Sequence, residues 1–338
     1  MVTRRETVLV RDAFAACPSL RAVALLASMW GAVILADDAS AQSYPNHPIR
    51  CIVSQAAGAS PDVVARIIAP RLSERLGQVV LIDNRVGANT IIGTEIAARS
   101  LPDGYTILLG TTALAINPSL YKLSYDTGKS FSPITQTVEV HFLLVVHPSL
   151  PVRTVAEFIT LAKTRPGQLM YSSSGTGSPS HLAGELLKNL TSIKLVHVPY
   201  KGGPQATADL IGGQIHLNFG VIATSLPLMK AGKIRALAVS SLKRSTILPE
   251  IPTVAETVPG FNLVGWQSFL VPAGTPGEII QRLHREIVAI LALPDVRERM
   301  LELGYETVGS SPREFAEFMR TNTAQFAKLI SGAGIRPE

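Results

Sequence analysis

The sequence contains little cysteine and little charge. Two cysteines occur in 338 residues, and 17% of the residues are charged, against roughly 25% in an average globular chain. So few cysteines exclude a small domain held together by disulfides. A hydrophobic content of 46% excludes an acidic disordered protein. The length corresponds to about two domains.

Clustered positive charge is also missing. Lys and Arg outnumber Asp and Glu by 31 to 25, which gives a net charge of +6. The basic residues are scattered, and no run of them is longer than a pair such as Lys243-Arg244. A surface that follows a phosphate backbone needs clustered Lys and Arg in marked excess. We therefore expect no nucleic-acid partner.

A hydrophobic run long enough to span a bilayer is missing as well. Ala22 to Ala36 is a run of 15 uncharged residues, whereas a spanning helix needs about 20. Arginines precede this run, and Ala39-Ser40-Ala41 follows it. This order predicts a signal peptide over residues 1–41, cleaved near Ala41, and a periplasmic location. A membrane anchor is the alternative, which the short run disfavours. Beyond Ala41 the only cysteine is Cys51, expected to be a small buried residue of a strand.

Catalytic and metal-binding motifs are absent from the sequence. No G-x-S-x-G elbow occurs, and the seven histidines have no metal-ligand spacing with cysteine or with one another. A serine hydrolase that uses Ser174 or Ser178 with His181 is the enzyme alternative, and no motif supports it. We therefore expect no enzyme activity, no cofactor and no metal site.

Short β-branched runs alternate with amphipathic segments along the chain, and this alternation predicts a parallel α/β architecture. The expected strands are 49–54, 79–83, 105–109, 142–146, 169–172, 195–198, 215–219, 235–240 and 268–271. The expected helices are 61–76, 91–99, 155–164, 179–190, 205–211, 225–231, 276–291, 295–303 and 312–331.

One local design occurs twice. In residues 49–61 and again in residues 169–179, a strand leads into a loop of small residues, and a Ser-Pro pair then opens a helix. Ser60 and Ser178 are the expected N-caps. Free backbone N–H groups at such a helix start form an anion site. Two such units suggest two lobes that close on one anionic ligand, although two ordinary turns would give the same pattern.

Many local strings make the chain similar, nearly from end to end after residue 43, to the extracytoplasmic solute receptors of the tripartite tricarboxylate transporter system, the Bug family. Their order and spacing carry the resemblance. They include Tyr44-Pro45, Arg71 to Gln78, Pro102 to Thr106, Leu109 to Thr112, Ala115 to Pro118, Ser174 to Ser178, His181 to Glu185, His197 to Gly202, Leu210 to Gln214, Ala236 to Val239 and Pro272 to Pro276.

The resemblance implies a two-lobed periplasmic binding protein fold of type II-like, Venus flytrap form, with the ligand cleft between two α/β lobes. Lobe one would comprise residues 43–145 and 266–338, and lobe two residues 146–265, with crossings near Val146 and Gly265. The implied function is a monomeric periplasmic receptor. It would capture a small carboxylate, a di- or tricarboxylate or an aromatic acid, by lobe closure and deliver it to a membrane permease. A sensory module of a signalling system is the alternative.

The resemblance also implies that backbone N–H groups of the two loops, residues 54–60 and 174–178, hold the carboxylate. Three roles stay open: Ser178 as ligand or only as cap, His181 in the cleft or packed on its helix, and Lys201 as ligand or solvated surface residue. The candidate binding residues are Gln55, Ala57, Gly58, Thr111, Thr112, Ser174, Gly175, Thr176, Ser178, His181, Tyr200 and Lys201.

Three positions depart from the pattern of the family. Gln55 stands where an aromatic residue is usual, Ala59 where a glycine is usual, and Gly220 where many members carry Asp. An Asp at that last position can pair with the amine of a ligand. Its replacement by Gly220 favours a polar carboxylate without a cationic group over an amino acid.

Overall fold

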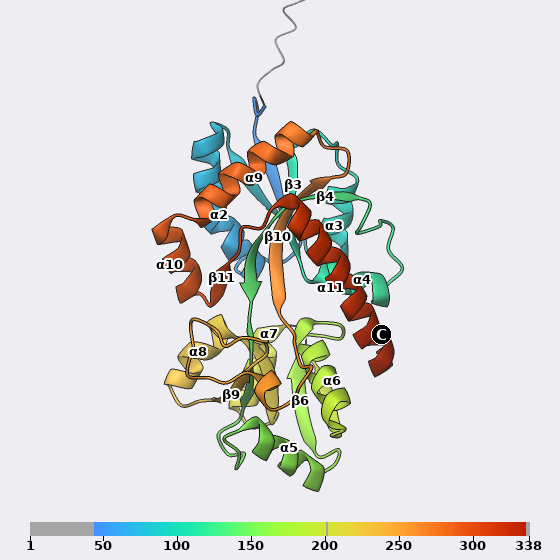
Figure 1. The fold of residues 1–338 in the computed structure, drawn as a ribbon, viewed down its shortest axis with the longest axis vertical. Helices are drawn as coiled ribbons and strands as arrows, with labels where there is room; N and C mark the ends of the chain where they lie inside the picture. Colours follow the sequence, from blue (N-terminus) through green and yellow to red (C-terminus); the bar gives the residue numbers. More distant parts are fainter. Residues whose placement is uncertain (1–43, 201, 336–338) are drawn as a thin grey trace, which may run out of the picture. The chain divides into compact units, whose positions relative to one another are not determined.

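Two β-sheets organise the chain (Figure 1). The computed structural model describes residues 44–200 and 202–335, and the expected signal peptide lies outside these ranges. Both sheets belong to one compact unit that begins at His47. None of the described helices is long and apolar enough to cross a bilayer.

The first sheet has the strand order β11-β4-β10-β3-β1-β2. Strand β1 runs parallel to β2 and β3, whereas β10 runs antiparallel to β3 and β4. The sheet is therefore mixed, not parallel as expected, and β4 and β11 are strands that the sequence analysis missed. The bounds are β1 Ile49–Val53, β2 Val80–Asn84, β3 Thr106–Thr111, β4 Phe131–Val140, β10 Gly265–Pro272 and β11 Tyr305–Thr307.

The second sheet has the strand order β7-β6-β8-β5-β9. Strand β6 is parallel to β7 and β8, whereas β5 is antiparallel to β8 and β9. This sheet is mixed as well. The bounds are β5 Phe142–Val146, β6 Leu169–Ser173, β7 Leu195–Pro199, β8 Leu217–Val221 and β9 Arg235–Val239.

Helices pack on both sheets. Helices α2, α3, α9 and α11 contact strands of the first sheet, and α6, α7 and α8 contact strands of the second. Ala113–Leu120 is a helix that the sequence analysis missed. The bounds are α2 Ser60–Leu76, α3 Ile91–Ala98, α4 Ala113–Leu120, α5 Val155–Thr164, α6 Pro179–Thr191, α7 Gly203–Ile211, α8 Ile222–Lys230, α9 Gly277–Leu291, α10 Pro294–Glu302 and α11 Pro312–Ala333, with a short 3₁₀ helix at Val254–Glu256.

The chain passes between the sheets twice. The first passage is at His141, because β4 ends at Val140 in the first sheet and β5 begins at Phe142 in the second. This passage is earlier than the expected crossing near Val146, since the apolar strand before Val146 pairs with β8 and β9. The second passage ends at Gly265, where β10 begins.

Each sheet carries its own core. In the first sheet, all eight residues of β10 are buried, with Trp266 and Phe269 each 1% exposed. In the second, Leu143 of β5 packs in a buried aliphatic cluster with Ile215 and Ile222. Burying such side chains stabilises each lobe by about 1.5–3 kcal/mol per residue.

The two lobes contact each other at two glycines. A Cβ on Gly177, in the loop after β6, would lie 2.4 Å from Leu120 Cδ1 of α4. A Cβ on Gly304, just before β11, would lie 2.7 Å from the backbone nitrogen of Ala223 in α8. Larger residues at these glycines would therefore collide with the opposite lobe.

Candidate functional site

The loop between β1 and α2 is the first of the two expected anion-binding loops. The Gly58 N–H donates to Asp62 Oδ2 at 2.8 Å, and the Ala59 N–H donates to the Ala56 carbonyl at 3.1 Å. Among the described residues, no partner is found for the Ala57 N–H. A carboxylate of the protein therefore already occupies the Gly58 amide, while the Ala57 amide stays available to a ligand.

Asp62 is the charge at this loop. It is 1% exposed and also accepts hydrogen bonds from Arg66 Nε at 2.7 Å and from Asn84 Nδ2 at 2.9 Å. Burial acts to raise the pKa of Asp62, but the hydrogen bonds from Arg66, Gly58 and Asn84 outweigh it and hold the pKa below its ordinary value. Asn84 also donates to the Gln55 carbonyl at 2.9 Å, so the same network positions the start of the loop.

Ser60 has a different role from the expected N-cap. Helix α2 begins at Ser60 itself, Ala59 is the N-cap, and no side chain caps the helix. The Ser60 hydroxyl instead accepts from Gln267 Nε2 at 2.6 Å and contacts the Tyr305 hydroxyl at 2.7 Å. Gln267 and Tyr305 come from β10 and β11, far along the chain, so the sequence carries no signal for this cluster.

Thr111 and Thr112 lie at the end of β3, beside the first loop's sheet edge. The Thr112 hydroxyl accepts the Trp266 N–H at 2.8 Å, and the Thr111 hydroxyl accepts the Ala113 N–H at 3.3 Å. Thr112 is 4% exposed and Thr111 is 9% exposed. Both hydroxyls thus already join β3 to its neighbouring segments. The Trp266 indole donates to Asn322 Oδ1 at 2.8 Å, which packs this tryptophan at the second crossing.

The loop between β6 and α6 is the second expected anion-binding loop. Ser178 is the N-cap of α6, as expected, and its hydroxyl accepts the His181 N–H at 3.4 Å. The Gly175 N–H donates to Ser173 Oγ at 3.2 Å, and the Ser174 N–H donates to a neighbouring serine hydroxyl at 3.1 Å. Neutral hydroxyls therefore hold the Ser174 and Gly175 amides of this loop.

Two histidines stack behind the second loop. The rings of His181 and His197 are 3.9 Å apart, and His181, 5% exposed, accepts the Gly177 N–H at Nδ1 over 3.0 Å. His197 Nε2 lies 2.7 Å from Ser173 Oγ. Burial, followed by the neighbouring His181, lowers the pKa of His197 to about 4. His181 is thus a buried packing residue that also orders the loop.

The buried carboxylate of Glu185 lies beside the stacked histidines. Glu185, 6% exposed, accepts from the Tyr171 hydroxyl at 2.5 Å and from Lys188 Nζ at 2.7 Å. His181 Nε2 lies 3.8 Å from the same carboxylate. The pair His181 and Glu185 is therefore internal, because Tyr171 of β6 packs against α6 where Gly184 leaves no Cβ.

Tyr200 flanks the second loop at the end of β7. Its hydroxyl donates to Asp209 Oδ2 at 2.5 Å, and its N–H donates to the Ser173 carbonyl at 3.1 Å. Burial, followed by Asp209, raises the pKa of Tyr200 to about 12. Its carbonyl oxygen lies 3.4 Å from where a Cβ on Gly175 would stand. Lys201 lies outside the described residues.

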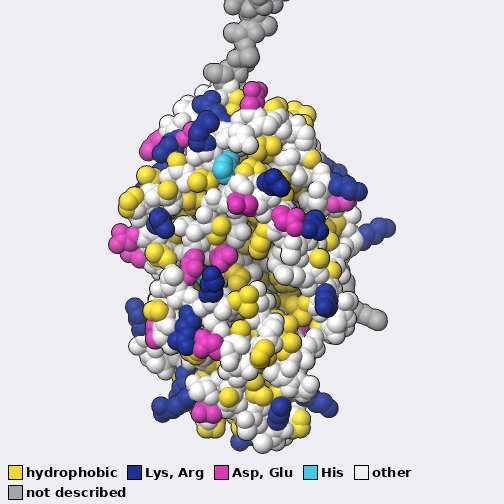
Figure 2. All heavy atoms as spheres, viewed as in Figure 1, with side chains coloured by type: hydrophobic (Ala, Val, Ile, Leu, Met, Phe, Trp, Pro, Cys, Tyr) yellow, Lys and Arg dark blue, Asp and Glu magenta, His cyan; other side chains and the backbone are white. Residues whose placement is uncertain are grey.

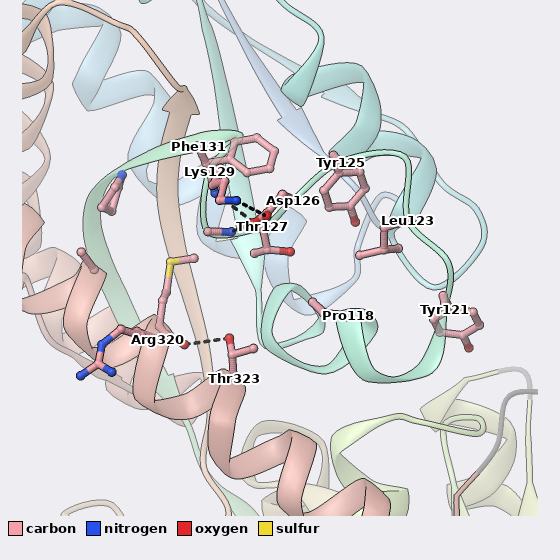
Figure 3. Close-up of a pocket in the computed structure, with 14 residues that line it drawn as sticks. Pro118, Tyr121, Leu123, Tyr125, Asp126, Thr127, Lys129, Phe131, Arg320 and Thr323 are labelled. Atoms are coloured by element: carbon pink, nitrogen blue, oxygen red, sulfur yellow. Dashed lines mark hydrogen bonds and ion pairs between the residues drawn. The ribbon is translucent and has the colours of Figure 1, made fainter.

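Two cavities occur away from these loops. One, of about 720 Å³, lies between the chain segment after α4 and helix α11 (Figure 3). Tyr125 and Phe131 line it, together with Lys129, which pairs with Asp126 at 3.7 Å. The other, of about 570 Å³, is lined by α6, residues 260–264 and α11. Neither cavity is lined by any of the expected binding residues.

Charge on the visible face is mixed. Basic and acidic side chains are interspersed there, with apolar side chains between them (Figure 2). No single-sign patch covers this face, which agrees with the scattered basic residues in the sequence.

Comparison with known proteins places this architecture among solute receptors. The family described as "Tripartite tricarboxylate transporter family receptor" matches residues 64–335. The protein BugT of Bordetella pertussis is 34% identical to the chain over 306 residues, which cover 89% of this chain and 94% of BugT.

Two solved structures resemble the fold. Rpa4515 of R. palustris with adipate is 36% identical, covers 87% of this chain and 100% of its own, and superposes with a TM-score of 0.80. MatC from Rhodopseudomonas palustris with bound malate is 27% identical, covers 85% and 100%, and superposes with a TM-score of 0.74. These matches confirm the resemblance seen in the sequence, the two-lobed fold and a receptor rather than an enzyme.

Proposed function

The chain belongs to the family of tripartite tricarboxylate transporter receptors, and on this premise we propose that it captures a small carboxylate between its two lobes outside the cytoplasm. The observation that carries the proposal is that two relatives with the same fold hold dicarboxylates, adipate in one and malate in the other. A di- or tricarboxylate is the ligand class that we propose here, with an aromatic acid as the next candidate.

The two loops after β1 and β6 support a binding mode. Each ends at the N-terminus of a helix of at least 13 residues, and the helix dipole favours an anion there. We propose that one carboxylate group meets the Ala57 amide and the Gln55 side chain, and that the other meets Ser174, Gly175 and Thr176. Ligand contacts to both lobes would favour the closed arrangement.

Gly220 supports a ligand without an amine. A Cβ on Gly220 would lie 2.6 Å from Ser225 Oγ, so the backbone is packed for glycine. No carboxylate can project from this position without a shift of its neighbours, and a ligand ammonium group would lack that partner. We therefore propose a ligand that carries carboxylates and no cation.

The ligand class can be tested by calorimetric titration of the mature chain. Adipate, malate and citrate are compared with adipamide, which has the length of adipate but no charge, and with aspartate. We expect binding of at least one carboxylate and none of adipamide, because charge-assisted hydrogen bonds supply the affinity. Binding of adipamide or of cationic compounds alone would overturn the proposal.

The binding mode can be tested with one side chain. Gln55→Ala removes the only long polar side chain of the first loop, and Gln168→Ala, at an exposed position before β6, is the matched control. We expect weaker carboxylate binding for Gln55→Ala, by roughly the fivefold or more that the loss of one hydrogen bond gives. Equal affinity in the two variants would remove Gln55 from the site.

We further propose that the loaded receptor delivers its ligand to a membrane permease, and that it acts as a monomer. Deletion of the gene should abolish cellular uptake of the labelled ligand identified above. Uptake that persists, together with a lost transcriptional response to the ligand, would instead favour a sensory module.

A further inference from the structure

Three metal-ligand side chains share one face of the first sheet at the crossing to the second lobe. Strand β11 pairs antiparallel with β4, and this register sets Glu306 directly opposite Glu139. His141 follows Glu139 by two residues, and alternate residues of an extended chain point to the same side. Two carboxylates and one imidazole therefore converge, although their positions in the sequence are far apart.

The distances place one atom of each residue around a common point. His141 Nε2 lies 3.4 Å from Glu306 Oε2 and 3.7 Å from Glu139 Oε2. All three potential ligand atoms lie within 4.8 Å of one another. A tetrahedral zinc ion with bonds of about 2.0–2.2 Å sets its ligand atoms roughly 3.3–3.6 Å apart. The two separations from His141 Nε2 are close to that spacing.

The imidazole of His141 provides an independent observation. It is 4% exposed, and neither Nδ1 nor Nε2 has a hydrogen-bond partner among the described residues. Buried polar atoms are almost always paired, because an unpaired one costs about 1–3 kcal/mol. An unpaired buried nitrogen that faces two carboxylates is the arrangement that a cation would complete.

The two carboxylate oxygens of Glu306 have different surroundings. Its Oε1 accepts from Ser245 Oγ at 3.1 Å and from the N–H and hydroxyl of Thr246, each at 3.0 Å. Its Oε2 is the atom that faces His141.

The facing glutamates would be unfavourable by themselves, because like charges directly opposite on adjacent strands repel. A divalent cation removes this repulsion and satisfies His141 at once. We propose that Glu139, His141 and Glu306 bind a first-row divalent metal ion, with zinc as the ion of best fit, through one nitrogen and two oxygens. Imidazole favours zinc over magnesium or calcium. Solvent completes the coordination, since Glu139 is 39% exposed.

The proposed metal site lies where the chain passes between the two sheets. His141 is the residue at which the chain passes between the sheets, and Glu306 of the first lobe also holds the loop after β9 in the second. A bound ion would therefore join the crossing segment to β11, and through Glu306 to the loop after β9, apart from the two loops after β1 and β6. The proposal does not depend on which ligand the cleft takes.

The test uses the untagged mature chain, stripped with a chelator and dialysed against ZnCl₂ at near-neutral pH. We expect one zinc per chain, and, with Co²⁺ in place of zinc, the visible absorption of a nitrogen- and oxygen-bound ion. Glu139→Gln and Glu306→Gln keep the shape of each side chain and remove one charged ligand. Glu302→Gln, at an exposed residue of the neighbouring helix, is the matched control.

Zinc affinity should fall in both ligand variants by at least the roughly 10–100-fold that changes outside the ligands themselves produce, and it should be unchanged in Glu302→Gln. Circular dichroism of the metal-free variants checks that they fold. No bound zinc, or equal zinc affinity in all variants, would overturn the proposal.

Discussion

The loops after β1 and β6 share one sequence design but differ in the groups that hold their amides. In the first loop, the Gly58 amide binds the buried carboxylate of Asp62. In the second, a serine hydroxyl binds the Gly175 amide, and the His181 imidazole binds the Gly177 amide. A helix start that tolerates a carboxylate of the protein is suited to one from a ligand. The first loop is therefore organised by charge and the second by neutral groups.

Removal of the charge from the first loop should have the largest effect. Asp62→Ala leaves Arg66 and Asn84 without their buried acceptor and frees the Gly58 amide. We expect the free energy of unfolding to fall by about 3 kcal/mol, since hydrogen bonds to charged groups contribute most. Urea denaturation measures the change. Asp295→Ala, which breaks an exposed ion pair with Arg71, is the control and should cost at most about 1 kcal/mol.

A loss below 1 kcal/mol for Asp62→Ala would mean that the first loop is not organised by charge. The milder Asp62→Asn keeps an oxygen for one donor. It should lie between the wild-type protein and Asp62→Ala in stability.

The second loop should show its difference in its response to pH. The pKa of His197 is about 4 in the folded state, against about 6.5 unfolded. The unfolded chain therefore binds a proton that the folded one excludes, and stability is lost as the pH falls from about 6.5 to about 4. After allowance for partial exposure of the ring, we expect a loss of about 1–2 kcal/mol.

Urea denaturation at several pH values measures this loss, and His197→Gln should reduce it. An NMR titration of the His197 ring that gave an ordinary pKa near 6.5 would contradict the prediction. The pKa of Asp62 is lowered instead, so its contribution is lost only below its unfolded pKa of about 3.9. The two loops should thus weaken in different pH ranges.

Alanine substitutions at one glycine of each loop should have the smallest effect on stability, and they compare the two loops directly. Gly58 and Gly177 have nearly equal φ values of +79° and +76°, so alanine at either position costs about 1 kcal/mol. Nothing lies within 4 Å of a Cβ on Gly58, whereas one on Gly177 meets Leu120 of the opposite lobe. We expect only Gly177→Ala to impair lobe closure and to weaken carboxylate binding several-fold.

Calorimetry with the carboxylate found for the wild-type protein measures both variants, and urea denaturation checks that their stabilities match. Equal affinities would show that the contact between Gly177 and Leu120 has no part in closure. A weaker affinity of Gly58→Ala alone would reverse the roles of the two loops.

Local signals in the sequence were sufficient for most elements but not for their directions. The apolar run Ile49–Val53 and the Ser178 cap are where the sequence predicts them, because both depend on neighbouring residues. Strand β4 was missed because Pro133 and buried Thr and Gln side chains hide its pattern. The antiparallel direction of β5 and β10 follows from the two crossings, which no local run encodes.

The two loops that we propose as the binding site were predictable as local structure for the same reason. Both loops follow from a repeated strand, loop and helix, and these patterns are local. The partner of Ser60 was not predictable, because Gln267 and Tyr305 reach it only through the pairing of distant strands. Asp62 is an acidic residue in the first turn of α2, and nothing local in the sequence indicates that its carboxylate binds the Gly58 amide.

Cys51 gives the first lobe a reporter of its own. It lies in β1 between β2 and β3, is 1% exposed, and burial, followed by the nearby Asp62, raises the pKa of its thiol to about 12. A chain without residues 1–41 has no other cysteine. An alkylating reagent therefore reacts only with molecules in which β1 has left the sheet. The labelling rate of Cys51 therefore measures how often the first lobe opens, without any substitution in the protein.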